Sequence, residues 1–586
     1  PPSRRSSAAT RQLRLPFLLP DSSPDASGIM PAVNRPTPAL VTQRAARRMP
    51  RLALLLLCAA YVLPGTLGRD PWRHADITAF GYMLSMAEGR SAWLSPSLGG
   101  IAAEAALLPY WLGAAFIKLL SPLLDPAIAA RLPFAALLGL TLALTWYAAY
   151  HLARTEAAQP VTFAFGGQAD PIDYARAVAD AAVLALIASL GLLQRGHETT
   201  PELAQLFAVS LTMWAMAAAP YRVWRARLGI VISLALLAGS GAPFVALAAG
   251  AASTVVCLRS NYAQVRRLAP WVALATVLAI VLAMRLNIWS WRLAMRPEAP
   301  RLASIARQWL WFLWPSWLLA LWTLWRWRQH LQHRHVSVPL VTAAVALLWS
   351  LAIGGSDRAL LLALPGMAVL AAFALPTLSR STTAAIDWFS MILFTLSAGA
   401  LWVIYASVQT GVPAKPAANI ERLAPGFAGE FSWWALLLAL AGSVGWLWLL
   451  RWRTGRHREA LWKSLVLPAG GVTLCWLLLM TLGLPMLDYG RSNRPLVERI
   501  ARHVPAGQCI AAPGQPTSLV AALEYFGPYA VDARHGAAHT RCNYLLRVTP
   551  VASPGQAPEG WTRIARERRP TDRNNLTSVY RRDGSR

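Results

Sequence analysis

Residues 52–76 read LALLLLCAAYVLPGTLGRDPWRHAD, an apolar run that passes directly into acidic and basic residues. The apolar part, 52–68, is long enough to cross about 30 Å of hydrocarbon as a helix. Arg69 and Asp70 follow at once, and charged side chains close behind an apolar run place its end at the membrane surface. This stretch therefore predicts a membrane-spanning helix that leads straight into a polar loop.

The composition of the whole chain agrees with a protein that lies in a membrane. Of its 586 residues 56% are hydrophobic and only 14% are charged, whereas soluble proteins carry about 25% charged residues. The 27 tryptophans suit the boundary between water and lipid, where the indole ring is buried while its N–H stays hydrated. The net charge is +28, and arginines cluster in short loops between apolar runs, as positive-inside topology predicts. This composition argues against a purely soluble enzyme and against nucleic-acid binding.

Apolar runs predict thirteen membrane-spanning helices. They lie at 52–68, 131–152, 178–193, 203–219, 228–240, 242–258, 268–287, 308–326, 336–354, 359–378, 386–407, 432–451 and 464–486. Five basic loops lie at 44–51, 222–227, 259–267, 326–335 and 451–463. An even number of spans separates each pair of these loops, so all five can lie in the cytoplasm. The start of the chain is then predicted inside and its C-terminus outside, with the proline-interrupted stretch 107–124 lying along the interface.

Composition divides the chain into three parts. Residues 1–48 are rich in Pro, Ser and Arg and are expected to be a disordered leader or sequence upstream of the true start. Residues 49–488 form the predicted helical membrane domain, whose first outer loop is 69–130. Residues 489–586 predict a small α/β domain outside the membrane, because CIAAP, YAVDA, CNYLLRV, WTRIARE and LTSVYRR have the composition of short strands. The run TSLVAALEYFG between the first two predicts a helix that ends at Gly527.

The first outer loop carries most of the candidate functional residues. Residues 68–111 read GRDPWRHADITAFGYMLSMAEGRSAWLSPSLGGIAAEAALLPYW. Asp70 and Asp76 come first, an amphipathic helix is expected over 75–87, and Glu104 follows that helix. Acidic side chains close to lipid are costly unless they are solvated or paired, so each is a functional candidate. The alternative for Asp70 and Asp76 is structural, in which they cap the start of the helix.

Three blocks of residues in this loop match the residue types and spacing of a known sequence motif. They contain Asp70, Arg73, Ala75, Asp76 and Ile77, then Trp93, Leu94 and Pro96, then Glu104, Leu108, Tyr110 and Trp111. In these blocks the loop resembles the polyprenyl-phosphate-dependent membrane glycosyltransferases of the GT-C class, which include the protein O-mannosyltransferases and the lipid A aminoarabinose transferases. Residues 358–375, RALLLALPGMAVLAAFAL, are similar to a basic residue and Leu-Pro helix of that family. Pro71 and Ala105 depart from it, because the family has a second acidic residue and a lysine there.

The resemblance implies a reaction and a set of roles. A sugar would move from a polyprenyl-phosphate donor to a hydroxyl of an extracytoplasmic acceptor, which could be lipid A, another envelope glycan or a protein. Asp70 matches the family's catalytic aspartate and would act as general base. Direct attack would invert the anomeric centre, so no carboxylate nucleophile is required. Glu104 is the second candidate catalytic residue. Arg73, Asp76 and Tyr110 would bind the substrates, and Arg358 would hold the phosphate.

A metal ion and a disulfide are further expectations. A divalent cation could share the task of balancing the phosphate charge, with Glu104, His197 and Glu198 as candidate ligands. The alternative for His197 and Glu198 is an ordinary solvated pair in a loop. Cys509 and Cys542 both lie in the predicted outer domain, where an oxidising compartment would allow them to pair.

The implied setting is a bacterial-type inner membrane, with the N-terminus in the cytoplasm and the C-terminal domain in the periplasm. The partners would be the lipid-linked donor, the bilayer and the acceptor, with no nucleic acid. One rival is a transporter or flippase for a lipid-linked sugar, which would place ionisable residues at mid-membrane, whereas here the candidates gather on one outer face. A second rival is a non-catalytic protein of envelope glycan assembly, which only an activity measurement separates from the enzyme.

Overall fold

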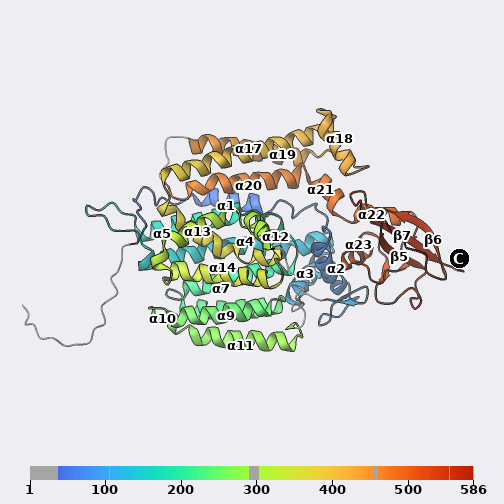
Figure 1. Ribbon diagram of the computed structural model, residues 1–586, viewed down its shortest axis with the longest axis horizontal. Helices are drawn as coiled ribbons and strands as arrows, with labels where there is room; N and C mark the ends of the chain where they lie inside the picture. Colours follow the sequence, from blue (N-terminus) through green and yellow to red (C-terminus); the bar gives the residue numbers. More distant parts are fainter. Residues whose placement is uncertain (1–36, 104–105, 290–301, 455–459, 554, 585–586) are drawn as a thin grey trace, which may run out of the picture. The chain divides into compact units, whose positions relative to one another are not determined.

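The computed structural model (Figure 1) describes residues 37–103, 106–289, 302–454, 460–553 and 555–584. Its α-helices are α1 Arg51–Val62, α2 Ala75–Ala87, α3 Leu108–Leu120, α4 Pro126–Ala153, α5 Pro171–Ala188, α6 Leu190–Arg195, α7 Pro201–Ala218, α8 Val223–Gly239, α9 Pro243–Leu258, α10 Ala263–Arg266, α11 Ala269–Arg285, α12 Leu302–Phe312, α13 Ser316–Arg326, α14 Arg334–Ala352, α15 Asp357–Leu361, α16 Leu364–Ala374, α17 Arg380–Thr410, α18 Ala414–Leu423, α19 Trp433–Thr454, α20 Lys463–Thr481, α21 Leu484–Arg491, α22 Arg494–Ile500 and α23 Thr517–Phe526. Its strands are β1 Ser97–Leu98, β2 Ile101–Ala102, β3 Cys509–Ala511, β4 Ala530–Asp532, β5 Tyr544–Pro550, β6 Trp561–Glu567 and β7 Asn575–Arg582. The predicted class, a polytopic helical membrane protein with a small C-terminal α/β domain, is confirmed.

Six of the described helical segments are long and apolar enough to cross a membrane. They are Pro126–Ala153, Ala263–Arg285, Arg334–Ala352, Arg380–Thr410, Trp433–Arg453 and Lys463–Thr481. Shorter apolar helices lie at Arg51–Val62, Leu108–Leu120, Pro243–Leu258 and Leu364–Thr377. The chain is therefore a multi-pass membrane protein, whereas the number of thirteen spans stays a prediction.

Two predicted spans are each divided into two helices near a proline. The stretch 308–326 becomes the end of α12 and all of α13, and Pro315 stands directly before α13. The stretch 359–378 falls mainly on α15 and α16, with Pro365 in the first turn of α16. A proline has no N–H to donate and its ring clashes with the carbonyl four residues earlier, so it favours the start of a helix. Helices α4, α14 and α20 nevertheless each continue through an internal proline, at Pro133, Pro339 and Pro468.

The core of the membrane part forms around α5. Almost every residue of α5 from Tyr174 to Ala188 is buried, and the helix packs against α4, α16 and α20. Its many alanines allow neighbouring backbones to approach closely. Helices α17 and α19 instead leave most of their apolar side chains exposed, as helices that face lipid must.

Helix α2 has the predicted bounds, but the prediction that it is amphipathic is wrong. Its residues from Asp76 to Met86 are buried, apart from half-buried Thr78, because α3, α4 and α23 surround it. Gly81 permits the close approach of α23, since a Cβ at this position would lie 2.7 Å from the Cβ of Ala521. The helix is enclosed by a partner from the far end of the chain, which the local sequence pattern of α2 does not reveal.

The C-terminal sheet confirms all five predicted strands and the helix between the first two. The strand order is β4-β3-β5-β7-β6. Strand β3 pairs in parallel with β4 and β5, and β7 pairs antiparallel with β5 and β6. Helix α23 connects β3 to the parallel strand β4, as a parallel pair requires. Its apolar residues join the same buried cluster as Leu546 and Val579 of the sheet.

Segments that were predicted on the same side of the membrane contact one another. On the outer side the contacts are Asp70 with Arg494, Arg195 with Asp357, Arg90 with Glu524, and Arg573 with the carbonyl of Arg422. On the inner side the N–H of Leu461 donates to the carbonyl of Ala45, and the indole of Trp462 donates to the carbonyl of Arg47. Each of these contacts joins two segments of one predicted group, and the assignment of the groups to the outer and cytoplasmic sides stays a prediction.

Candidate functional site

Two segments that are far apart in the sequence are hydrogen-bonded to each other. We call them loop 69–73, which follows α1, and segment 488–494, which runs from the end of α21 to the first residue of α22. The Asp70 N–H donates to Oδ2 of Asp488 at 3.2 Å, and the Trp72 indole N–H donates to Oδ1 at 2.7 Å. The Arg73 N–H donates to the carbonyl of Arg491 at 2.9 Å. Segment 488–494 therefore positions the loop that carries the candidate base.

Cation–π contacts add to this pairing of the two segments. The guanidinium groups of Arg69 and Arg491 lie 4.6 and 5.0 Å from the ring centroid of Trp72. A guanidinium over an indole face is attracted by the negative face of the ring. Trp72 is buried, so it forms the apolar centre around which the charged groups of the site are arranged.

Asp70 accepts two hydrogen bonds from one guanidinium. Nε of Arg494 donates to Oδ2 at 2.9 Å, and Nη2 donates to Oδ1 at 2.6 Å. The Asp70 side chain is 14% exposed and that of Arg494 is 48% exposed. This bidentate pair holds the carboxylate in a fixed orientation, and one side of it is open to water.

Asp488 is a second carboxylate beside Asp70. Burial raises the pKa of Asp488 to about 6. The hydrogen bond from the Trp72 indole lowers this pKa, whereas the negative charge of Asp70 raises it. Asp488 therefore changes charge close to neutral pH while it holds the loop of Asp70 in place.

Asp76 is the centre of a buried network behind the loop. Its Oδ1 accepts hydrogen bonds from the N–H and the hydroxyl of Thr199 at 2.8 and 2.6 Å, and its Oδ2 accepts one from the Trp72 N–H at 3.1 Å. Arg69 lies 3.2 Å away, and both side chains are inaccessible to water. Burial would raise the pKa of Asp76, but the charges of Arg69 and Arg131 and the bonds from Thr199 lower it overall.

Arg358, predicted to hold the phosphate, is bound to two glutamates. Its guanidinium lies 2.8 Å from Glu198 and 3.4 Å from Glu202. Glu198 also pairs with Arg195 at 2.9 Å. Arg358 therefore borders the site, but much of its charge is already balanced by acids of the same cluster.

Two arginines with less compensation, Arg73 and Arg569, lie beside that cluster and close to His74. Burial lowers the pKa of Arg569 to about 10 and the charge of Arg73 lowers it further, while the nearby charge of Asp572 acts in the opposite direction. Burial also lowers the pKa of His74, followed by the charges of Arg73, Arg569, Arg358 and Arg195. In the part of the chain that the structure describes, no acidic side chain lies within ion-pair distance of Arg73 or Arg569. This excess of positive charge suits an anionic ligand.

The backbone of His74 is strained at this point. Its φ is 74°, in the left-handed region that few residues other than glycine adopt. His74 directly precedes α2, so this turn sets the direction of loop 69–73 relative to the helix that carries Asp76. Strained residues of this kind concentrate at functional sites.

Two of the three proposed metal ligands, His197 and Glu198, already have other partners in the structure. Nδ1 of His197 lies 2.6 Å from the carbonyl of Leu193, and Nε2 lies 2.8 Å from that of Tyr61. Burial lowers the pKa of His197 to about 4. Glu198 is committed to arginines, and Glu104 lies outside the described residues. Among the residues that are described, no three His, Cys, Asp or Glu side chains are grouped as metal ligands would be, so these side chains do not fit a metal centre.

Tyr110 lies in the first turn of α3, where its side chain is buried. Its ring centroid is 5.4 Å from that of Tyr82 in α2. Tyr110 thus packs between the first two helices of the outer loop, and its predicted contact with a substrate stays a prediction.

Four residues of the site were missed in the sequence, namely Asp488, Arg491, Arg494 and Arg569. The first three lie in DYGRSNR at 488–494, which follows the last predicted span as GRD follows the first. The criterion that selected Asp70, an acid at the end of an apolar run, would also have selected Asp488. Arg569 lies between β6 and β7 and carries no comparable signal.

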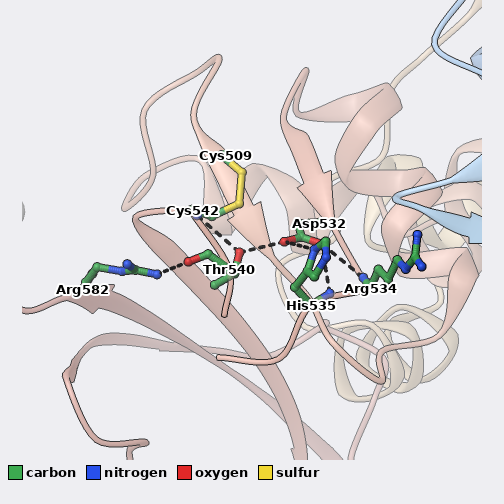
Figure 2. Close-up of a disulfide and its surroundings, with 7 residues drawn as sticks. All are labelled: Cys509, Asp532, Arg534, His535, Thr540, Cys542 and Arg582. Atoms are coloured by element: carbon green, nitrogen blue, oxygen red, sulfur yellow. Dashed lines mark hydrogen bonds and ion pairs between the residues drawn. A yellow bond between two sulfur atoms is a disulfide. The ribbon is translucent and has the colours of Figure 1, made fainter. Parts of the chain in front are cut away.

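A disulfide in the C-terminal domain joins Cys509 and Cys542, whose Cα atoms are 4.9 Å apart (Figure 2). It connects β3 to the chain just before β5. Nearby, Asp532 at the end of β4 accepts hydrogen bonds from the Thr540 hydroxyl at 2.8 Å and from the His535 N–H at 3.1 Å. These contacts organise the loop between β4 and β5.

Known structures share this fold. The chain is similar to ArnT from Cupriavidus metallidurans bound to undecaprenyl phosphate, with a TM-score of 0.60, 14% identity, and coverage of 90% of this chain and 96% of that one. It is also similar to the same protein in the apo state, with a TM-score of 0.61, 14% identity, and coverage of 90% and 97%. No family model and no curated protein sequence matches the chain. At this identity the likeness is one of fold, and it agrees with the expected architecture of a helical membrane part followed by a small C-terminal domain.

Proposed function

We propose that this protein is a membrane glycosyltransferase that moves a sugar from a polyprenyl-phosphate donor to an extracytoplasmic hydroxyl acceptor, with Asp70 as the general base. The observation that carries the proposal is the arrangement of Asp70 beside a group of poorly compensated cations, in the fold of a protein that has been solved with undecaprenyl phosphate. A base and an anion site next to each other are what the transfer requires.

The roles of the residues follow from their surroundings. The acceptor O–H would give its proton to Asp70, the oxygen would attack the anomeric carbon, and the lipid phosphate would leave with the bonding electrons. Arg73 and Arg569, with the neighbouring Arg491, would hold the phosphate oxygens by charge-assisted hydrogen bonds. Asp76 would hold Arg69 and the loop in place, and Asp488 would fix the backbone of Asp70.

An apolar hollow next to segment 488–494 offers a place for the isoprenoid chain. It lies between α17, α20 and α21, and its lining includes Leu401, Tyr405, Val408, Leu478, Leu482 and Met486. Met486 stands two residues before Asp488. A lipid chain in this hollow would bring its phosphate close to the cations of the site, since the hollow and the site share α21.

The proposal also includes an orientation, with the C-terminal domain in the periplasm of a bacterial-type inner membrane. The disulfide supports it, because such bonds persist in oxidising compartments. Alkylation of intact cells under non-reducing conditions should leave Cys509 and Cys542 unlabelled until a reductant is added. Two thiols that react freely before reduction would contradict this orientation.

The decisive experiment is sugar transfer by purified protein in lipid vesicles, with a panel of polyprenyl-phosphate sugars and envelope lipid extract. Asp70→Asn should lower transfer by about 10²–10⁴-fold, the usual contribution of a general base, while the protein stays folded. Glu88→Gln is the matched control, because Glu88 lies in the same loop at the exposed ion pair with Arg90. Equal transfer by wild type and Asp70→Asn would remove Asp70 from the mechanism. Donor binding without transfer of any sugar would favour a flippase or an assembly protein.

A further inference from the structure

The pairing of Asp70 with Arg494 raises a question about the proposed reaction. Both carboxylate oxygens of Asp70 accept hydrogen bonds from Arg494, so the candidate base is occupied by a cation. The attraction in this ion pair is lost when the carboxyl group becomes neutral, because only one of the two partners then carries a charge. A base that is paired in this way needs the cation to leave as the proton arrives.

During the proposed reaction, negative charge is lost at Asp70 and gained at the lipid phosphate. Asp70 begins as an anion and becomes neutral when it takes the proton of the acceptor hydroxyl. The lipid phosphate begins as a phosphodiester with one negative charge and gains a second when the bond to the sugar breaks. One cation is therefore released and another is needed in the same step.

Arg494 is placed so that it can change partners. Its side chain is 48% exposed, so it is not locked in a packed core. Its guanidinium also lies 4.6 Å from the ring centroid of Phe526, an aromatic face on which a guanidinium can stack without a fixed hydrogen-bond partner. Arg494 also lies close in the chain to the cations of the site. It follows Arg491 by three residues, and the carbonyl of Arg491 accepts a hydrogen bond from the N–H of Arg73.

We propose that Arg494 passes from Asp70 to the phosphate of the lipid-linked donor, so that one guanidinium stabilises first the base and then the leaving group. This inference rests on the proposed function. The acceptor O–H bond breaks and its proton bonds to Asp70, the acceptor oxygen bonds to the anomeric carbon, and the bond from that carbon to the phosphate oxygen breaks with its electron pair on the phosphate. Arginine suits both partners, because its planar fork makes two parallel hydrogen bonds to a carboxylate or to a phosphate.

A binding cycle tests the exchange without requiring transfer. Binding of undecaprenyl phosphate is measured for wild type, Asp70→Asn, Arg494→Gln and the double variant. Asp70→Asn frees Arg494, so its affinity should rise about fivefold, the size expected for a coupled charge pair. In the Arg494→Gln background the same change should have little effect. An equal gain in both backgrounds would overturn the proposal, because it would reflect only repulsion between Asp70 and the phosphate. Absence of binding by wild type would refute the proposed function itself.

Transfer kinetics give a second test. Arg494→Gln should lower kcat by about a hundredfold, as loss of a donor to developing charge does, with a smaller change in the donor KM. Arg494→Lys should recover part of kcat, since it keeps the charge but loses the fork. Arg502→Gln, an exposed arginine just after α22, should leave both constants unchanged. A rise of the same size in the donor KM, with kcat unchanged, would make Arg494 a simple binding residue and would contradict the exchange.

Discussion

Asp70 and Asp76 lie six residues apart, yet they occupy opposite environments. Asp76 is enclosed by donors that cannot move away, namely Arg69, Thr199 and the backbone of Trp72. Asp70 has a half-exposed arginine as its ion-pair partner and is open to water on one side. A carboxylate with several fixed donors holds a structure together, whereas one with an exchangeable partner can act on a substrate. The comparison assigns structure to Asp76 and chemistry to Asp70.

The largest effect on stability is expected at the buried member of the pair. Asp76→Asn removes the charge that compensates Arg69, so the free energy of unfolding should fall by about 3–5 kcal/mol, the usual cost of breaking a buried ion pair. Thermal unfolding in detergent measures it. The comparison would be broken by an Asp76→Asn protein as stable as wild type, or by an Asp70→Asn protein that is the less stable of the two.

The next effect concerns the cations around Asp70. Arg73→Gln and Arg569→Gln should each raise the donor KM about tenfold or more, because a hydrogen bond to a charged group contributes about 1.5–3 kcal/mol. Steady-state transfer with varied donor concentration measures this change. Arg541→Gln, an exposed arginine of the same C-terminal domain, is the control. A donor KM unchanged in both variants would place the phosphate elsewhere.

A pH dependence is expected from Asp488. Its pKa in the folded protein is raised to about 6 from an ordinary value near 4. The folded state therefore binds the proton more tightly than the unfolded state, so this contribution to stability is present below about pH 4 and is lost as the pH rises through 6. The melting temperature of wild type should fall relative to Asp488→Asn between pH 5 and 7. Parallel curves for the two proteins over that range would argue against it.

The smallest effect on stability is expected at an exposed ion pair. Arg176 and Asp173 form an ion pair at 3.7 Å on the first turns of α5, with about a third of each side chain exposed. Arg176→Gln should change the free energy of unfolding by less than about 0.5 kcal/mol. A loss as large as that of Asp76→Asn would show that burial is not what separates the two aspartates.

Much of the fold could be predicted because its signals are local. The strand-like runs of the C-terminal domain and the helix over 75–87 match β3 to β7 and α2 in position. The environment of α2 could not be predicted, since its enclosure depends on α23, far along the chain. The breaks before α13 and between α15 and α16 were also missed, although Pro315 and Pro365 stand at those positions, because apolar composition continues across each break.

The candidate site was predicted only in its first half. Asp70, Arg73 and Asp76 were identified because they lie in one loop behind an apolar run. Asp488 and Arg494 were not, although Arg494 is the ion-pair partner of Asp70, 424 residues away. The partners of Arg358 were missed for a similar reason, since its two glutamates come from the 198–202 region, and its role at the phosphate stays a prediction.

The sequence by itself determined that the chain lies in a membrane, where its apolar runs begin and end, and which acids and arginines border them. These properties follow from hydropathy and residue spacing, which act over one or two turns of chain. Only the tertiary structure decided which charge meets which: that Asp70 faces Arg494, that Asp76 is buried against Arg69, and that Arg73 and Arg569 are left poorly compensated. Coulomb energies and burial depend on distances in space. Asp70 and Arg494 are 424 residues apart in the sequence and meet only when the first outer loop packs against the start of the C-terminal domain.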